Sequence, residues 1–121
     1  MKLSINSVEF SVVIPTYNRS HLVGRAVQSA LSQRKKPREI LVVDDGSTDD
    51  TREQLYSFRD TITYLYQQNS GASRARNHGA RVALCDWIAF LDSDDVWDSD
   101  YLHGMESAIA ATMGKANFYF S

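Results

Sequence analysis

Short runs of consecutive apolar residues alternate along the chain with longer segments in which apolar residues recur every three or four positions. Runs of the first kind are typical of strands buried on both faces, and the second pattern is typical of helices with one buried face. The runs predict strands at residues 10–15, 39–43, 62–66 and 87–91, and the beginning of a fifth at 117–120. The periodic segments predict helices at residues 20–32, 47–58, 72–84 and 99–113.

Strand and helix alternate four times, which predicts a parallel sheet sandwiched between helices with right-handed crossovers. The 121 residues suffice for one domain, which we expect to span residues 1–121. The expected fold class is therefore α/β, a Rossmann-like three-layer sandwich with a mainly parallel sheet. We expect the strand at 87–91, which lacks polar alternation, to be central and covered on both faces. In the strand at 62–66, the alternation set by Thr61 and Thr63 would also suit an edge.

Local signals predict where two helices begin and how two others pack. Ser20 is the expected N-cap of the first helix, and Ser47 with Asp50 resembles a capping box for the second. The third helix has a face of small residues that permits close approach to the sheet: Ala72, Ala75, Gly79 and Ala83. The fourth is expected to bury Tyr101, Leu102, Met105, Ala108, Ile109 and Thr112.

The strand at 87–91 ends abruptly in three carboxylates, Asp92, Asp94 and Asp95. Side chains two positions apart on an extended backbone point the same way, so we expect Asp92 and Asp94 to converge and Asp95 to point elsewhere. Converging carboxylates repel one another unless a cation lies between them, and oxygen ligands suit hard cations such as Mg²⁺ or Mn²⁺. The alternative is that these aspartates cap the following helix, which Asp95 or Asp98 could do.

The second predicted strand also ends in acid, because Asp44 and Asp45 precede Gly46, which suits a tight turn. In open α/β sheets ligands bind outside the carboxyl ends of the strands, so both acidic ends mark a candidate site. Arg74 and Arg76 lie in the first turns of the third predicted helix, where basic residues oppose the helix dipole. They are expected either to contact an anion or to pair with carboxylates of the acidic loops.

Composition narrows the classes of partner. With 23% charged residues and a formal net charge of −2, there is no reason to propose nucleic acid or an anionic membrane surface as a partner. The single cysteine, Cys85, cannot form an internal disulfide, and the N-terminal residues lack the apolar core of a signal peptide. No stretch approaches the roughly 18 apolar residues of a membrane span. The expected location is therefore cytoplasmic, including the inner face of the membrane.

Four stretches, in this order, resemble the nucleotide-binding half of the family 2 glycosyltransferases, which have the GT-A fold. They are SVVIPTYNR at 11–19, EILVVDDGSTDDT at 39–51, NSGASRARNHGA at 69–80 and WIAFLDSDDVW at 87–97. The resemblance spans nearly the whole chain and implies the N-terminal, nucleotide-sugar-binding part of such a domain, truncated as its fifth strand begins. Members of this family transfer a sugar from a nucleotide diphosphate to an acceptor hydroxyl, with inversion at the anomeric carbon.

The resemblance implies roles for residues that follow the first two strands. Pro15, Tyr17 and Arg19 would line the nucleotide pocket, with Tyr17 supplying an aromatic face. Asp45 would accept a hydrogen bond from the base, commonly uracil.

It also implies roles for the acidic motif and its neighbours. Asp92 would lie near the ribose or the metal, and Asp94 would bind the divalent cation, Mn²⁺ or Mg²⁺, that bridges the diphosphate. Asn69 and Arg76 would brace the acidic loops or contact the nucleotide. The residues expected to bind the nucleotide sugar are then Pro15, Tyr17, Arg19, Asp44, Asp45, Arg76, Asp92 and Ser93, and those expected to bind the metal are Asp94 and Asp92.

One departure from the family is large. The family's general base, which deprotonates the acceptor hydroxyl, is an acidic residue well downstream, so we expect no catalytic residue in this chain, which ends at Ser121. The expected partners are a nucleotide-sugar donor and, bound largely elsewhere, a carbohydrate or lipid-linked acceptor. We therefore predict that this chain holds a nucleotide and transfers sugar poorly or not at all. We also predict self-association through an unpaired edge of the sheet.

Three other classes of protein fit parts of the pattern. A non-catalytic nucleotide-sugar-binding module is the main alternative, because a donor site without a base binds without turnover. A receiver-type signalling domain also gathers aspartates at strand ends, but it needs an acidic pair early, and the first strand here ends in Pro15, Thr16 and Tyr17. A sugar nucleotidyltransferase would need a glycine-rich, basic loop after the first strand, and none follows it.

Overall fold

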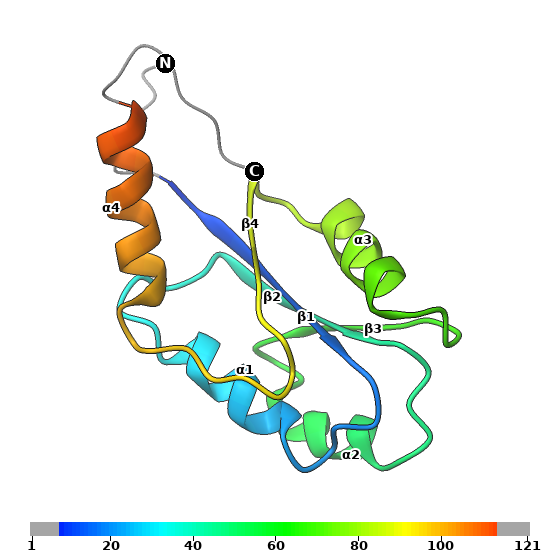
Figure 1. Cartoon of the computed structure of the whole chain (residues 1–121). Coiled ribbons are helices and arrows are strands. Elements are labelled where there is room, and N and C mark those ends of the chain that lie inside the picture. The colour runs from blue at the N-terminus through cyan, green and yellow to red at the C-terminus, as the bar shows by residue number, and fades with distance from the viewer. Residues whose placement is uncertain (1–7, 114–121) are drawn as a thin grey trace.

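The computed structural model describes residues 8–113, and its elements follow the predicted alternation of strand and helix (Figure 1). The strands are β1 Phe10–Thr16, β2 Glu39–Asp44, β3 Thr63–Tyr66 and β4 Trp87–Phe90. The helices are α1 Val23–Leu31, α2 Thr51–Leu55, α3 Ala72–Val82 and α4 Tyr101–Met113, with a 3₁₀ turn, η2, at Tyr56–Phe58. Within this part of the chain, no helix is long and apolar enough to cross a bilayer. The strand predicted at 117–120 lies outside the described residues.

The four strands form one parallel sheet in the order β3-β2-β1-β4. Side chains alternate between the two faces of β1, and each face has its own apolar core. One core joins Val12 and Ile14 to helices α1, α2 and α4, and the other joins Val13 to α3 through Ala75. Figure 1 shows α3 on the opposite side of the sheet from α1 and α4. The predicted three-layer α/β sandwich with a parallel sheet is confirmed.

The edges of the sheet correct one prediction. The expectation that β4 is central and covered on both faces is wrong for residues 8–113, where β4 pairs with β1 alone and the Phe90 side chain is 44% exposed. An apolar run indicates that its residues are buried, as Ala89 and Leu91 are, but it does not indicate how many strands pair with it. β3 forms the other edge, as its alternation allows. Self-association through such an edge stays a prediction.

Both predicted helix caps are wrong, because their polar groups are used in contacts between and within loops. Ser20 lies before the N-cap of α1, and its side chain hydrogen-bonds to Asp50 in the loop after β2. Ser47 likewise lies before the N-cap of α2, and its Oγ accepts a hydrogen bond from the N–H of Asn18 at 2.9 Å. Loop contacts therefore override the local capping signals.

Two of the four residues of the predicted small face, Ala75 and Gly79, are buried against the sheet, while Ala72 is exposed and Ala83 is half-buried. Ala75 is fully buried, and a Cβ placed on Gly79 would lie 2.5 Å from Val13 Cγ1. Real Cβ atoms do not approach other atoms so closely, so the helix can lie at this distance from β1 only with glycine at this position.

α4 buries a narrower stripe than predicted. Leu102 and Ile109 lie in the core. Tyr101 instead stacks on Trp97, with ring centroids 4.6 Å apart, and is partly exposed. Of the other predicted core positions, Met105 and Ala108 are exposed and Thr112 is half-buried.

Candidate functional site

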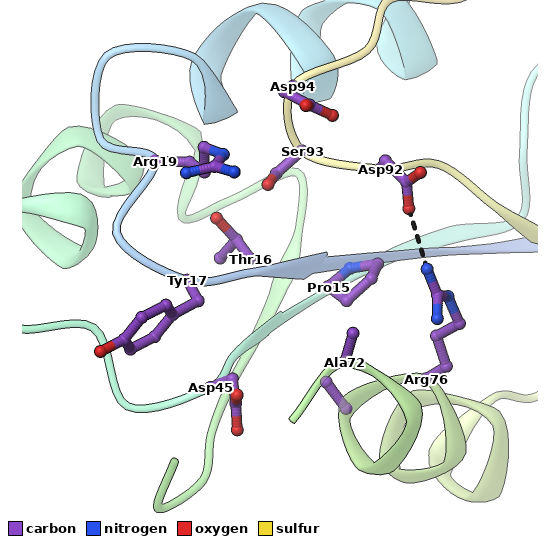
Figure 2. A pocket seen from close by; sticks show the side chains of 11 residues that line it. Pro15, Thr16, Tyr17, Arg19, Asp45, Ala72, Arg76, Asp92, Ser93 and Asp94 are labelled. Carbon is purple, nitrogen blue, oxygen red and sulfur yellow. Dashed lines mark hydrogen bonds and ion pairs between the residues drawn. The ribbon is translucent and has the colours of Figure 1, made fainter. Parts of the chain in front are cut away.

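A pocket of about 320 Å³ opens at the carboxyl ends of β1, β2 and β4 (Figure 2). It lies between the segments that follow these strands and the first turns of α3. Ligands of open α/β sheets bind at this edge, so the pocket is the candidate site. Its lining residues are Pro15, Thr16, Tyr17, Arg19, Asp45, Ala72, Ala75, Arg76, Asp92, Ser93 and Asp94.

The pocket contains every residue predicted to bind nucleotide sugar or metal except Asp44. Sequence reasoning missed Thr16, Ala72 and Ala75 as lining residues. The two alanines are predicted to pack on the sheet, and their small side chains also leave the pocket open. Nothing in the sequence separates Thr16 from the other residues at the end of its strand.

Asp44, the last residue of β2, is buried and does not line the pocket. Its Oδ1 accepts a hydrogen bond from the N–H of Ser47 at 2.9 Å, and its Oδ2 accepts one from the Tyr64 hydroxyl at 2.6 Å. Burial first, and then the hydrogen bond to Asp44, raises the pKa of the Tyr64 phenol far above its ordinary value. Tyr64 therefore stays a donor, and Asp44 joins the end of β2 to β3.

Asp45 does line the pocket, and protein donors hold its carboxylate in one orientation. Its Oδ1 accepts hydrogen bonds from Gln67 Nε2 at 2.8 Å and from the N–H of Ser70 at 2.7 Å. Its Oδ2 accepts hydrogen bonds from Asn69 Nδ2 at 3.1 Å and from the N–H of Gly71 at 3.0 Å. Burial raises the pKa of Asp45, but the hydrogen bonds from Gln67, Ser70 and Gly71 together outweigh burial and bring the pKa below its ordinary value of 3.8. The carboxylate is therefore charged at neutral pH and already oriented.

Gly46 lets the chain turn tightly beside Asp45. It has a positive φ of 77°, and a Cβ there would lie 2.7 Å from the backbone nitrogen of Asn69. Glycine adopts this conformation without strain, whereas a side chain would be strained and would meet the neighbouring backbone. The turn predicted at Gly46 is confirmed, and it brings Asn69 against Asp45.

Asn18 joins the loop after β1 to the loop after β2. Its Oδ1 accepts a hydrogen bond from the N–H of Thr48 at 2.8 Å, and its own N–H donates to Ser47 Oγ at 2.9 Å. Its φ is +49°, a conformation in which asparagine is enriched among non-glycine residues. The link fixes the loop that carries Tyr17 and Arg19. An asparagine between two predicted pocket residues is the sequence signal that could have found it.

The acidic segment after β4 forms a turn and not the extended strand predicted for it. β4 ends at Phe90, and the N–H of Asp95 donates to the carbonyl of Asp92 at 3.0 Å. Asp92 and Asp94 nevertheless both line the pocket, while the Asp95 carboxylate accepts a hydrogen bond from the N–H of Val96 at 3.1 Å. The structure therefore brings Asp92 and Asp94 to one pocket, although alternation along a strand is not the cause.

Asp98 makes hydrogen bonds just ahead of α4, where helix capping is the alternative for the acidic motif. Its Oδ1 accepts a hydrogen bond from the N–H of Asp100 at 2.8 Å, and its carbonyl accepts one from the N–H of Tyr101 at 3.1 Å. The entry to α4 is thus satisfied without Asp92 or Asp94.

Arg76 and Asp92 form an ion pair across the pocket, with Nη2 and Oδ1 3.2 Å apart (Figure 2). The basic residues of this helix are predicted either to contact an anion or to pair with a carboxylate, and in the structure Arg76 pairs with a carboxylate. Arg19 has no carboxylate within 4.0 Å among the described residues. Arg19 therefore leaves a positive charge available to an anionic ligand in the pocket.

Asp92 and Asp94 are the pocket carboxylates that could hold a divalent cation. In residues 8–113, no three His, Cys, Asp or Glu side chains are grouped as a metal site. Two carboxylates without further protein ligands suit Mg²⁺ or Mn²⁺ that is also held by substrate phosphates. The donor set therefore fits a cation that binds together with a phosphorylated ligand.

Residues 11–115 match the family described as Glycosyl transferase family 2. The chain is 40% identical over 103 residues to the Escherichia coli UDP-Glc:alpha-D-GlcNAc-diphosphoundecaprenol beta-1,3-glucosyltransferase WfaP, a match that covers 80% of this chain and 41% of WfaP. The chain spans less than half the length of the most similar curated relatives, and as little as 17% of one of them.

Two solved structures resemble this fold. S. aureus TarS in complex with UDP-GlcNAc superposes with a TM-score of 0.75 at 31% identity, over 86% of this chain and 32% of that chain. The mannosyltransferase PcManGT from Pyrobaculum calidifontis, in complex with GDP-Man and Mn²⁺, has a TM-score of 0.71 at 27% identity, over 78% of this chain and 30% of that chain. Since the family match covers residues 11–115, which take in every residue that lines the pocket, the chain belongs to glycosyltransferase family 2.

Proposed function

We propose that this chain supplies the donor site of an inverting glycosyltransferase that takes its sugar from a nucleotide diphosphate, with UDP-sugars preferred. The observation that carries the proposal is the pocket at the carboxyl edge of the sheet, where the oriented carboxylate of Asp45 and the turn with Asp92 and Asp94 face one space. The relatives support the choice of donor, because TarS is solved with UDP-GlcNAc and WfaP is a glucosyltransferase whose name gives UDP-Glc as the donor.

The base of the nucleotide is proposed to bind between Tyr17 and Asp45. The Tyr17 side chain is 43% exposed and offers an aromatic face to a planar base. Asp45 would accept a hydrogen bond from an N–H of the base, commonly uracil, by sharing an oxygen that the protein already orients. Because this carboxylate needs no rearrangement, binding loses less free energy to ordering.

The diphosphate is proposed to bind at the other end of the pocket, beside the acidic turn. Asp94 would hold Mn²⁺ or Mg²⁺ there, with Asp92 near the ribose or the metal. When bound, the cation stabilises the negative charge that the leaving diphosphate gains as the glycosidic bond breaks. Arg76 would keep Asp92 in place, and Arg19 would add positive charge. The Mn²⁺ in PcManGT supports this choice of cation.

The general base is proposed to lie outside residues 8–113. Asp45 is bound by four protein donors, Asp92 is paired with Arg76, and Asp94 faces the proposed cation, so none is placed to take a proton from an acceptor hydroxyl. The acceptor is proposed to be a carbohydrate, either free or lipid-linked. WfaP, whose acceptor is GlcNAc-diphosphoundecaprenol, supports the lipid-linked form.

Isothermal titration of UDP with and without Mn²⁺, with GDP and dTDP as comparators, tests the donor site. We expect UDP to bind in a Mn²⁺-dependent way, and Asp94→Asn to weaken binding roughly 10- to 100-fold, as the loss of groups that support a metal typically does.

Asp95→Asn is the matched control, because it makes the same charge change in the same turn outside the pocket. It should bind UDP like the wild type. Absence of UDP binding by the wild type, or equal losses in both variants, would contradict the proposal.

A non-catalytic nucleotide-sugar-binding module is the second candidate. It is favoured because protein groups engage the pocket carboxylates of Asp45 and Asp92, and the third, Asp94, is assigned to the proposed cation. Replacing the matching segment of WfaP with this chain would separate the two. Sugar transfer by the chimera supports a transferase donor site. Loss of transfer with UDP binding intact supports the module.

A further inference from the structure

Thr16, the last residue of β1, carries a polar group for which the fold provides no partner. Its side chain is 3% exposed, and within residues 8–113 its Oγ1 is the one buried side-chain nitrogen or oxygen atom without a hydrogen bond. Such a group costs free energy on folding, because water satisfies it in the unfolded chain. Native proteins rarely keep one unless a ligand or an ordered water completes it.

The surroundings of the hydroxyl show where its partner would lie. Thr16 lines the pocket, and Figure 2 shows its oxygen turned toward Arg19 and Ser93. Ser93 is 6% exposed, and its hydroxyl, which is not fully buried like that of Thr16, makes no side-chain hydrogen bond within the described part of the chain. Arg19 has no carboxylate partner there. Two hydroxyls and one guanidinium without partners therefore meet at one corner of the pocket.

This donor corner, formed by Thr16, Arg19 and Ser93, suits the oxygens of a phosphate. Hydroxyls and a guanidinium donate strong hydrogen bonds to such oxygens because the acceptor is charged. In Figure 2 Asp45 lies on the far side of Thr16 from Ser93, so the base and the donor corner occupy different parts of the pocket.

We propose that the Thr16 hydroxyl donates a hydrogen bond to a diphosphate oxygen of the bound nucleotide sugar and so positions the diphosphate. This inference rests on the proposed function and adds to it a residue that the sequence does not mark. The hydroxyl would lack a hydrogen bond in the free protein and gain one in the complex. The free-energy cost of the missing hydrogen bond would then be removed on binding, which favours the bound state.

Thr16→Val tests the proposal, because it removes the hydroxyl and nearly keeps the shape of the side chain. In the free protein, Tm should stay the same or rise, since an unsatisfied buried group is removed. In the presence of Mn²⁺, the affinity for UDP should fall roughly tenfold, the change that follows from losing one hydrogen bond to a charged group. The affinity for uridine, followed by NMR titration, should not change, because uridine has no phosphate.

Thr16→Ser keeps the hydroxyl and should bind UDP close to the wild-type affinity. Thr63→Val is the matched control, because Thr63 is an exposed threonine on β3 outside the pocket, and it should leave UDP binding unchanged. Circular dichroism checks that each variant folds. If Thr16→Val does not fold, Thr16→Ala provides the same comparison.

The inference is wrong if wild type binds UDP while folded Thr16→Val binds it equally tightly, since a water would then complete the hydroxyl. Equal losses for UDP and uridine would also overturn it, because the contact would then be with the nucleoside. Failure of the wild type to bind UDP would contradict the proposed function itself, and this inference with it.

Discussion

The segments that follow β2 and β4 form two ends of one pocket but are built differently. At the first end, four protein donors surround the buried carboxylate of Asp45. At the second, Asp92 and Asp94 are exposed, and the ion pair with Arg76 is the contact that ties their turn to α3. The first end is complete in the folded chain, whereas the second concentrates charge that a cation would balance. Folding therefore prepares the end of the pocket proposed for the base, while we expect binding to complete the end proposed for the diphosphate.

Asp45→Asn should have the largest effect, because an amide cannot accept hydrogen bonds from all four donors and turns its own N–H groups toward two of them. Buried donors would be left unpaired, and the free energy of unfolding should fall by about 3 kcal/mol. Urea denaturation at neutral pH measures this change. Asp95→Asn, on the exposed turn, should change the same quantity by less than about 0.5 kcal/mol. If the two variants proved equally stable, the contrast between the two ends would not hold.

Lowering the pH should also remove the stability that Asp45 contributes, but progressively, whereas the Asp45→Asn substitution removes it at once. Burial raises the pKa of Asp45 and its hydrogen bonds lower it further, so in the folded chain it lies below the ordinary 3.8. As the pH falls, the unfolded chain takes up the proton first. The stability that Asp45 contributes is therefore complete above that ordinary value and is lost as the pH falls through the folded pKa.

The measurement is the difference in unfolding free energy between wild type and Asp45→Asn, followed from about pH 5 down to pH 3. We expect this difference to shrink. A difference that stays constant would mean that the folded and unfolded carboxylates have the same pKa.

Of these changes, Arg76→Gln should have the smallest effect on the stability of the protein without ligand. The side chains of Arg76 and Asp92 are 40% and 56% exposed, and an exposed ion pair contributes little. The free energy of unfolding should fall by less than about 0.5 kcal/mol, and by less still in about 1 M salt. Urea denaturation at two salt concentrations checks both statements. A loss as large as that of Asp45→Asn would mean that the acidic turn is also fixed by folding.

The sequence could predict most of the candidate site because site residues follow strands, and parallel strands end at one edge of a sheet. Asp45 and Asp94 are found in this way, and Tyr17 through the resemblance to the family. The sequence could not separate Asp44 from Asp45. Neighbouring side chains at a strand end point to opposite sides, and the contacts of β2 with β1 and β3 decide which one faces the pocket.

The remaining errors concern contacts between residues distant in sequence. Ser20 looks like a helix cap, but Asp49 accepts its N–H from another loop. The apolar run of β4 indicates burial and not the number of its neighbours. Thr16 resembles any other strand residue, because the absence of a partner for its hydroxyl depends on every group around it.

Gly79 determines the width of a pocket that it does not line. Its lack of a side chain lets α3 rest directly on Val13 of β1. Arg76 lies on the preceding turn of the same helix, and Pro15 faces the same side of β1 as Val13, so the separation of two walls of the pocket depends on how closely α3 packs here. Any larger residue at this position would push the helix outward and enlarge the cavity without altering a single residue that a ligand would touch. The packing of the core beneath the candidate site thus sets the dimensions of the site.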